Sequence, residues 1–406
     1  MKLTSQISKN NYLSFLWHAT FLALAQNFMD IDTIIPAMMV DAGGTSLHIG
    51  LLTAIMIGGG KLSQLFFAPF LSNNPRKKKF LLIGINARVL ALAGMGLLFI
   101  FSASLASNLV ILLILTLIFV FAISGGFANI NYTDILGKSI LKSRRKHFFS
   151  IKQIITSLGV LVSAYFARSI LRHHPYPDNY SLLFLIAAGL LAVASLGFWK
   201  IKEALADNLT IKHFKDFFQV TIQEFKENKR LLHYLFILNT QGTTLVLMPF
   251  LILYAKQRLG ADSYAIGNYL LLKVIGGVLV GSILFYYARK IRYHFMLYVT
   301  SIMAILSIIA LLIFPGELLF PYIFLAGGII YALHRIVISG VLLEVTNSKN
   351  RALYTGLSGA GNILPSSLPL IGGFLVKQYG FHTLFLIIIF FILSSFYFIY
   401  KLNCQL

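Results

Sequence analysis

The sequence predicts an all-α membrane protein that crosses the bilayer many times, and three observations support this prediction. Of its 406 residues, 58% are hydrophobic and only 12% are charged, and the mean hydropathy is +0.81. The apolar residues gather in long blocks, and most of the basic residues lie between those blocks. Because a soluble protein carries about a quarter charged residues, a soluble enzyme of two or three domains is excluded.

Twelve blocks are long enough to cross the hydrocarbon layer as helices, which takes about 20 mostly apolar residues. They are too long and too uniformly apolar for the strands of a membrane barrel. The first block is too long for a cleaved signal peptide, and it contains Asp30 and Asp32. The predicted spans lie near residues 13–40, 47–71, 80–102, 107–131, 149–171, 180–199, 232–255, 264–287, 294–314, 319–343, 353–376 and 382–400.

The distribution of basic residues orients these spans. With the N-terminus in the cytoplasm, the cytoplasmic segments hold 25 of the 34 Lys and Arg residues, and the opposite side holds five. Such an excess is typical of cytoplasmic loops. We therefore expect a multi-pass protein of the cytoplasmic (inner) membrane with both termini in the cytoplasm. Anionic lipid headgroups then account for the net charge of +21 without any nucleic-acid partner.

The longest loop, residues 200–231, is expected to join two halves of six spans each, residues 1–199 and 232–406. Apolar residues recur in this loop at helical spacing, with charged residues on the opposite side. This pattern predicts an amphipathic helix that lies along the cytoplasmic membrane surface and tethers the halves. Its apolar face consists of Phe214, Phe217, Phe218, Ile222 and Phe225.

The two halves share short segments in the same order. Residues 46–50 (SLHIG) precede a glycine pair at 59–60, and residues 263–267 (SYAIG) precede a glycine pair at 276–277 with the same spacing. Both segments open the second span of their half. This agreement predicts an internal duplication, which is how many secondary transporters are built.

These features together resemble the major facilitator superfamily. The loop between spans two and three of that family reads approximately Gly-x-x-x-Asp-Arg-x-Gly-Arg-Arg. Residues 68–77 (APFLSNNPRK) and 281–290 (GSILFYYARK) keep its basic end, whereas the acidic position of the first copy is Ser72. Span eleven resembles the gating helix of the family in its residues Gly359, Gly361, Pro365, Pro369, Gly372 and Gly373. The resemblance implies 12 transmembrane helices in two six-helix pseudo-repeats around a central cavity, which spans one and ten help to line.

The two acids of span one are candidates for function, because a charge in hydrocarbon is costly. Asp30 shares a polar helical stripe with Asn27 and Thr33, so we interpret it as a carboxylate that faces the cavity and carries a proton. The alternative is a structural pair with a buried Lys or Arg. Asp32 is the second candidate for proton coupling, and for it the structural pair, or a place near the outer mouth, is the preferred interpretation.

Basic residues inside the blocks favour contact with an anion. Lys61 lies about 15 Å from the nearest basic loop at 1.5 Å per residue, and Lys273 lies in the middle of its span. Arg335 follows Tyr331 by four residues, and a buried guanidinium usually meets a carboxylate of the substrate or of the protein itself. The predicted substrate-binding residues are Arg335, Lys273, Lys61, Tyr269, Tyr331 and His334, with Asn27, Asn239 and Asn362 as uncharged hydrogen-bonding partners. Purely structural ion pairs are the alternative.

Four charged residues follow spans four and ten at comparable places in the two halves. We expect Asp134 with Arg145, and Glu344 with Arg351, to act as gating charges that change partners as the halves move. The single cysteine, Cys404, excludes a disulfide framework and a metal site built from cysteines. No cofactor or metal is expected.

The sequence therefore predicts a secondary active transporter for a small polar solute. Four cations against two acids within the spans favour an anionic or zwitterionic organic solute, with proton coupling through Asp30. The alternatives are multidrug or toxic-metabolite efflux by proton antiport, uptake of a metal-chelating metabolite, and a non-transporting scaffold or receptor. An enzyme is not expected, because the ten His residues are dispersed and no nucleophile motif is present. The expected partners are the solute, a proton or other coupling ion, and the lipid bilayer, with the chain as a monomer.

Overall fold

The computed structural model describes residues 4–203 except 73 and 75, residues 228–287, residues 291–345 except 315, and residues 359–402 except 360. Throughout these ranges every regular element is a helix, so the all-α prediction is confirmed. The amphipathic helix predicted between spans six and seven, as well as Arg351 and Cys404, lies outside the described residues.

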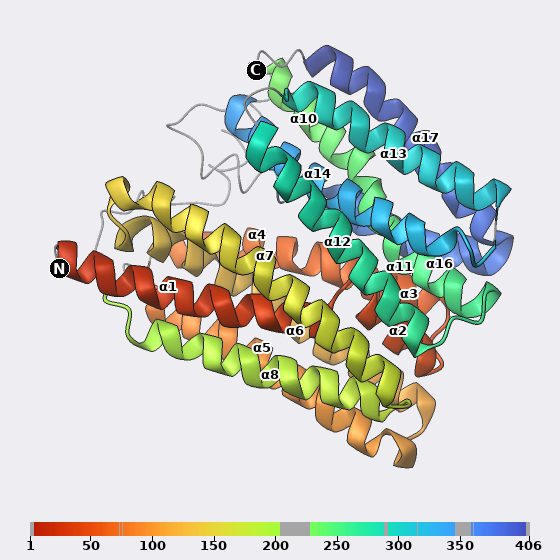
Figure 1. Cartoon of the computed structure of the whole chain (residues 1–406), viewed down its shortest axis with the longest axis horizontal. Helices are drawn as coiled ribbons and strands as arrows, with labels where there is room; N and C mark the ends of the chain where they lie inside the picture. Colours follow the sequence, from red (N-terminus) through yellow and green to blue (C-terminus); the bar gives the residue numbers. More distant parts are fainter. Residues whose placement is uncertain are drawn as a thin grey trace. The chain divides into compact units, whose positions relative to one another are not determined.

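The chain forms two compact units. The first comprises Met1–Asp30, Asp41–Gly43 and Gly59–Phe214, and the second comprises Ile31–Val40, Gly44–Gly58 and Lys215–Leu406. The helices of the first unit are α1 (Ser5–Gln26), α4 (Gly60–Ser72), α5 (Lys78–Phe101), α6 (Ser107–Ser139), α7 (Lys142–His173) and α8 (Asp178–Trp199). Within this unit α5 packs along both α6 and α8, while α1 packs along α7 and α8 (Figure 1).

The second unit contains two short helices from early in the chain and seven helices from its second half. They are α2 (Ile34–Asp41, except its last residue), α3 (Ser46–Ala54), α10 (Lys229–Thr240), α11 (Thr244–Arg258), α12 (Ser263–Tyr287), α13 (Tyr293–Ile313), α14 (Phe320–Val345), α16 (Ile363–Tyr379) and α17 (Phe381–Leu402). The most extensive packing joins α12 to α14 and α3 to α16 (Figure 1).

Nine helices in the described part of the chain are long and apolar enough to cross a membrane. The other three expected spans are short or interrupted. Span one stops at Gln26, passes through a 3-10 turn at Asn27–Met29, and resumes as α2. Span two contains a π-helical turn at Ile55–Gly59 between α3 and α4, and α16 of span eleven has only 17 residues.

Polar side chains cap the first turns of several helices, where the backbone N–H groups have no partner within the helix. The Thr4 hydroxyl accepts a hydrogen bond from the Ile7 N–H at 3.3 Å and so caps α1. The Asn228 side chain accepts one from the Leu231 N–H at 3.1 Å and caps α10. Thr45 and His48 form a capping box at the start of α3.

Two glycines bring the backbones of α12 and α14 together. A Cβ atom on Gly276 of α12 would overlap the carbonyl oxygen of Leu325, and one on Gly328 of α14 would overlap the carbonyl oxygen of Lys273. Small residues permit such an approach in a membrane, where helices associate by close packing rather than by the hydrophobic effect. Gly276 of the predicted glycine pair therefore has a packing role.

The variant Gly276→Ala is expected to lower the melting temperature of the protein, because the added methyl group forces α12 and α14 apart. Overpacking of this kind costs about 1–3 kcal/mol. The matched control is Gly281→Ala on the same helix, where nothing lies within 4 Å of the added Cβ atom. Thermal unfolding in a neutral detergent compares them, and equal melting temperatures for both variants would contradict the close approach at Gly276.

Candidate functional site

The break in span one places both of its acids on irregular backbone. Asp30 follows the 3-10 turn in an extended conformation, with φ −64° and ψ 123°. The prediction placed Asp30 and Asp32 on one continuous helix. The break shows that they are not on one helix. Interrupted helices at membrane depth expose backbone groups that side chains can use, and transporters often bind solutes there.

Asn27 holds this break against α7 within the first unit. Its side-chain amide donates hydrogen bonds to the Val160 carbonyl at 2.6 Å and to the Ser163 hydroxyl at 3.0 Å. The residue is 2% exposed. Asn27, a predicted substrate contact, therefore connects the break in span one to α7 in the interior of the unit.

Asp32 and Lys273 form a buried ion pair within the second unit. The Lys273 Nζ atom donates to the Asp32 Oδ2 atom at 2.5 Å, and the two residues are 8% and 6% exposed respectively. The same ammonium lies 5.7 Å from the ring centre of Tyr331 on α14. Because an isolated charge in hydrocarbon is costly, each of these residues offsets the burial cost of the other.

Tyr269 lies one turn before Lys273 on α12 and packs among aromatic rings. Its ring stacks on Phe324 with centres 4.6 Å apart and an interplanar angle of 6°, and it meets Phe320 edge-on at 5.4 Å. The residue is buried. Its ring therefore belongs to the α12–α14 packing rather than to an open surface.

Arg335 lies on the exposed side of α14, one turn after Tyr331. Among the described residues its guanidinium has no hydrogen bond or ion pair with another side chain, although its carbonyl accepts the Ser339 hydroxyl at 2.8 Å. Arg335 thus differs from Lys273, whose charge is already balanced.

His334 points the other way, into the interior of the second unit. Its Nδ1 atom lies 3.1 Å from the Gln241 Oε1 atom. The Gln241 amide donates to the Leu297 carbonyl and to the Ser301 hydroxyl, both at 2.8 Å. Gln241 begins the 3-10 turn Gln241–Thr243 between α10 and α11, so this buried chain of hydrogen bonds braces the break in span seven.

Asn239 and Asn362 lie where spans seven and eleven are irregular. The Asn239 amide donates to the Gly361 carbonyl at 2.7 Å, and its oxygen accepts the Leu364 N–H at 2.8 Å, so this side chain caps α16. Asn362 precedes α16 and is 7% exposed. Its Oδ1 atom has no hydrogen-bond partner in the described part of the chain. Asn239 therefore has a structural role, whereas Asn362 keeps an available acceptor.

Lys61 is the second residue of α4, directly after the π-helical turn of span two. It is partly buried in the first unit. No ion pair involves it within the described ranges. Arg88, by contrast, lies over the ring of Phe121 with its guanidinium carbon 4.2 Å from the ring centre.

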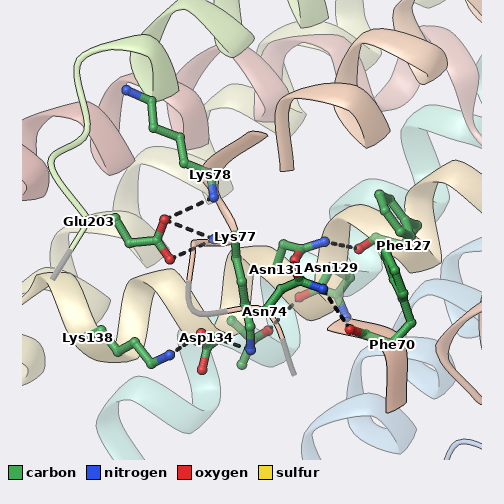
Figure 2. A network of polar contacts seen from close by, with 11 residues as sticks. Phe70, Asn74, Lys77, Lys78, Phe127, Asn129, Asn131, Asp134, Lys138 and Glu203 are labelled. Carbon is green, nitrogen blue, oxygen red and sulfur yellow. Dashed lines mark hydrogen bonds and ion pairs between the residues drawn. The ribbon is translucent and has the colours of Figure 1, made fainter. Parts of the chain in front are cut away.

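A polar network surrounds the loop between α4 and α5 in the first unit (Figure 2). Asp134 near the end of α6 contacts the Lys77 and Lys138 ammonium groups at 3.1 and 2.6 Å. Glu203, just after α8, accepts the backbone N–H groups of Lys77 and Lys78 at 2.9–3.0 Å, as Figure 2 shows. The side chain of Arg145, the partner expected for Asp134, lies outside the described part.

In the second unit the corresponding acid is Glu344 at the end of α14. It pairs with Arg230 at the start of α10, with 2.9 Å between the Arg230 Nη2 and Glu344 Oε1 atoms. Both acids named as gating charges are therefore held by basic residues that sequence spacing did not identify.

Sequence reasoning missed Gln241, Lys77 and Glu203, as well as the two basic residues Lys138 and Arg230. Gln241 had a detectable signal, because it lies in the polar run Thr240–Thr244 inside an apolar block. Lys77 and Glu203 had none, since each meets its partner from more than 50 residues away. No group of three His, Cys, Asp or Glu side chains that could hold a metal ion occurs among the described residues.

The model of the Major Facilitator Superfamily matches residues 16–368 of the chain. The chain belongs to the major facilitator superfamily. The family resemblance drawn from the loops and from span eleven is thereby confirmed, and the protein is a multi-pass membrane transporter by family. No curated protein sequence matches the chain.

Solved structures of transporters share the fold of this family member at low sequence identity. The nucleoside transporter NupG is 15% identical with a TM-score of 0.64, covering 97% of this chain and 98% of its own. A POT family transporter in complex with 5-aminolevulinic acid is 13% identical with a TM-score of 0.69, covering 97% and 96%. A D-xylose–proton symporter is 12% identical with a TM-score of 0.67, covering 95% and 96%. At these identities the likeness shows the fold alone.

Proposed function

We propose that this transporter moves a small anionic or zwitterionic organic solute by alternating access. The proposal rests on which basic residues of the second unit are paired with an acid and which are not. Lys273 is neutralised by Asp32 at 2.5 Å, whereas Arg335 has no counter-charge among the described residues. A guanidinium at membrane depth is costly unless an anion meets it.

The surroundings of Arg335 suit a polar solute. Its planar fork of N–H donors matches the two oxygens of a carboxylate or phosphate. Tyr331 lies one turn away on the same helix and borders the Lys273–Asp32 pair. In the same unit the Asn362 side-chain oxygen is buried and has no hydrogen-bond partner among the described residues, so it can accept a hydrogen bond from a solute N–H or O–H. We propose a solute contact for Lys61 within the first unit as well, because that ammonium also lacks an ion pair in the described part.

The orientation with both termini in the cytoplasm, the inner-membrane location and the monomeric state belong to the same proposal. The orientation and the location are supported by the 25-to-5 distribution of basic residues. We also propose that residues 1–199 and 232–406 are the repeated halves, and that Asp134 and Glu344 are gating charges that exchange partners during transport.

Arg335→Gln is expected to weaken binding of the solute by at least about tenfold, since a hydrogen bond to a charged group contributes about 1.5–3 kcal/mol. The measurement is a thermal-shift screen of the purified protein against anionic, zwitterionic and cationic metabolites, because a ligand of the native state raises its melting temperature. Lys61→Gln is expected to act in the same direction, and Arg335→Lys to retain part of the response. Arg172→Gln is the control.

Stabilisation by organic anions that survives unchanged in Arg335→Gln would contradict the proposed contact. Stabilisation by lipophilic cations alone would favour drug efflux, and a metal-chelating hit would favour uptake of a chelator. If no metabolite stabilises the protein, the non-transporting scaffold is the better interpretation.

We propose in addition that Asp30 couples transport to protons. Asp30 is buried beside the break in span one, and binding of a proton there would neutralise a carboxylate charge that is costly at membrane depth. In proteoliposomes Asp30→Asn is expected to abolish solute accumulation driven by a pH gradient while exchange of solute across the membrane continues. Asp178→Asn serves as control. Accumulation by Asp30→Asn with the pH dependence of the wild type would refute the coupling.

A further inference from the structure

The second unit contains a cavity of about 470 Å³. Arg335 is not among the residues that line it. Its lining comes from the α2–α3 turn, from the last turns of α11 and α16, and from the start of α17. The lining residues that matter here are Thr45, Ser46, Arg258, Lys377, Gly380 and Phe381. All of them belong to the second unit.

Local interactions hold the walls of this cavity in place. The Ser46 hydroxyl donates to the Gly373 carbonyl on α16 at 2.9 Å, which ties the start of α3 to that helix. Gly380 ends α16 with φ 83°, a backbone conformation that favours glycine, and so turns the chain directly into α17. The Tyr254 ring packs edge-on against the Phe381 ring, with the ring centres 5.1 Å apart.

The cavity is basic. Arg258 and Lys377 both line it, and both are exposed. Neither has a hydrogen bond or ion pair within the described ranges, and no acidic side chain is among the lining residues. A basic residue in the last turn of a helix is favourable by itself, because it offsets the helix dipole. The helix dipole does not explain why cations from two different helices line the same cavity.

The position of these cations is unusual for this chain. Only five of its 34 basic residues lie on the side that the charge distribution predicts to be external. Arg168, Arg172 and Lys256 of these five interact with other groups of the protein. The remaining two line this cavity, together with the Thr45 hydroxyl and the first residues of α3 and α17, whose N-terminal ends carry partial positive charge.

We propose that this cavity is an oxyanion-binding site, separate from the solute site at membrane depth. Its ligand is a phosphate or carboxylate group, held by Arg258 and Lys377 and by the Thr45 hydroxyl. Val376 and Phe381 supply apolar wall for the carbon part of such a molecule. The group belongs either to a soluble anion or to the headgroup of an anionic lipid.

Inorganic phosphate is the probe for the test. Its effect on the melting temperature of the full-length protein in neutral detergent is measured at constant ionic strength, with chloride as the replaced anion. Phosphate is expected to raise the melting temperature of the wild type. In the Arg258→Gln/Lys377→Gln variant the apparent affinity is expected to fall by about tenfold or more, as for the loss of charge-assisted hydrogen bonds.

The matched control is Arg168→Gln/Arg172→Gln, which also removes two external cations but leaves the cavity intact, and its phosphate response is expected to equal that of the wild type. A phosphate response no larger than that of chloride would overturn the proposal. So would a full response in Arg258→Gln/Lys377→Gln.

Two further arms separate the sources and the two sites. In nanodiscs, a phosphate affinity that is weaker in phosphatidylglycerol than in phosphatidylcholine assigns the site to lipid headgroups, and equal affinities assign it to a soluble anion. Arg258→Gln/Lys377→Gln keeps Arg335 and Lys61, so its response to a solute found in the metabolite screen is expected to equal that of the wild type. The proposed transport function can thus fail while this site stands, and the reverse holds as well.

Discussion

A polar group in the hydrocarbon of a bilayer has to find its partner inside the protein, because no water is available there. The pair of Asp32 and Lys273 meets this requirement for a fixed charge of each sign. It also ties the short segment after the break in span one to α12. The same requirement applies where a spanning helix is interrupted, since a break releases backbone groups that need partners.

Three side-chain amides perform this task at three irregular places. Asn27 anchors the break in span one to α7, Gln241 crosses the break in span seven to α13, and Asn239 caps the start of α16 in span eleven. In the part of the chain that the structure describes, some other polar atoms have no hydrogen bond or ion pair. They include the Arg335 guanidinium, the Lys61 ammonium and the Asn362 side-chain oxygen, and two of these three carry positive charge.

The sequence was sufficient for the family, for the all-α fold and for most of the spans, because apolar blocks near 20 residues long leave no other structure in a membrane. It did not reveal that span one is discontinuous. A polar stripe such as Gln26, Asn27 and Asp30 is equally compatible with an intact helix and with a break. The site residues were harder to predict. An asparagine inside a span can bind solute, or it can satisfy backbone groups where a helix is interrupted. The sequence alone does not distinguish these two uses. Pairings such as Asp134 with Lys77 depend on tertiary contacts that spacing along one helix cannot indicate.

Whether Asp32 and Lys273 neutralise each other is measured by a double-mutant cycle. Asp32→Asn and Lys273→Met are made singly and together, and thermal unfolding is measured for each in neutral detergent. Each single variant leaves an uncompensated buried charge and should lose about 3–5 kcal/mol of stability. The double variant is expected to recover most of that loss. Losses that simply add in the double variant would contradict the ion pair, because they would show that the two residues do not interact.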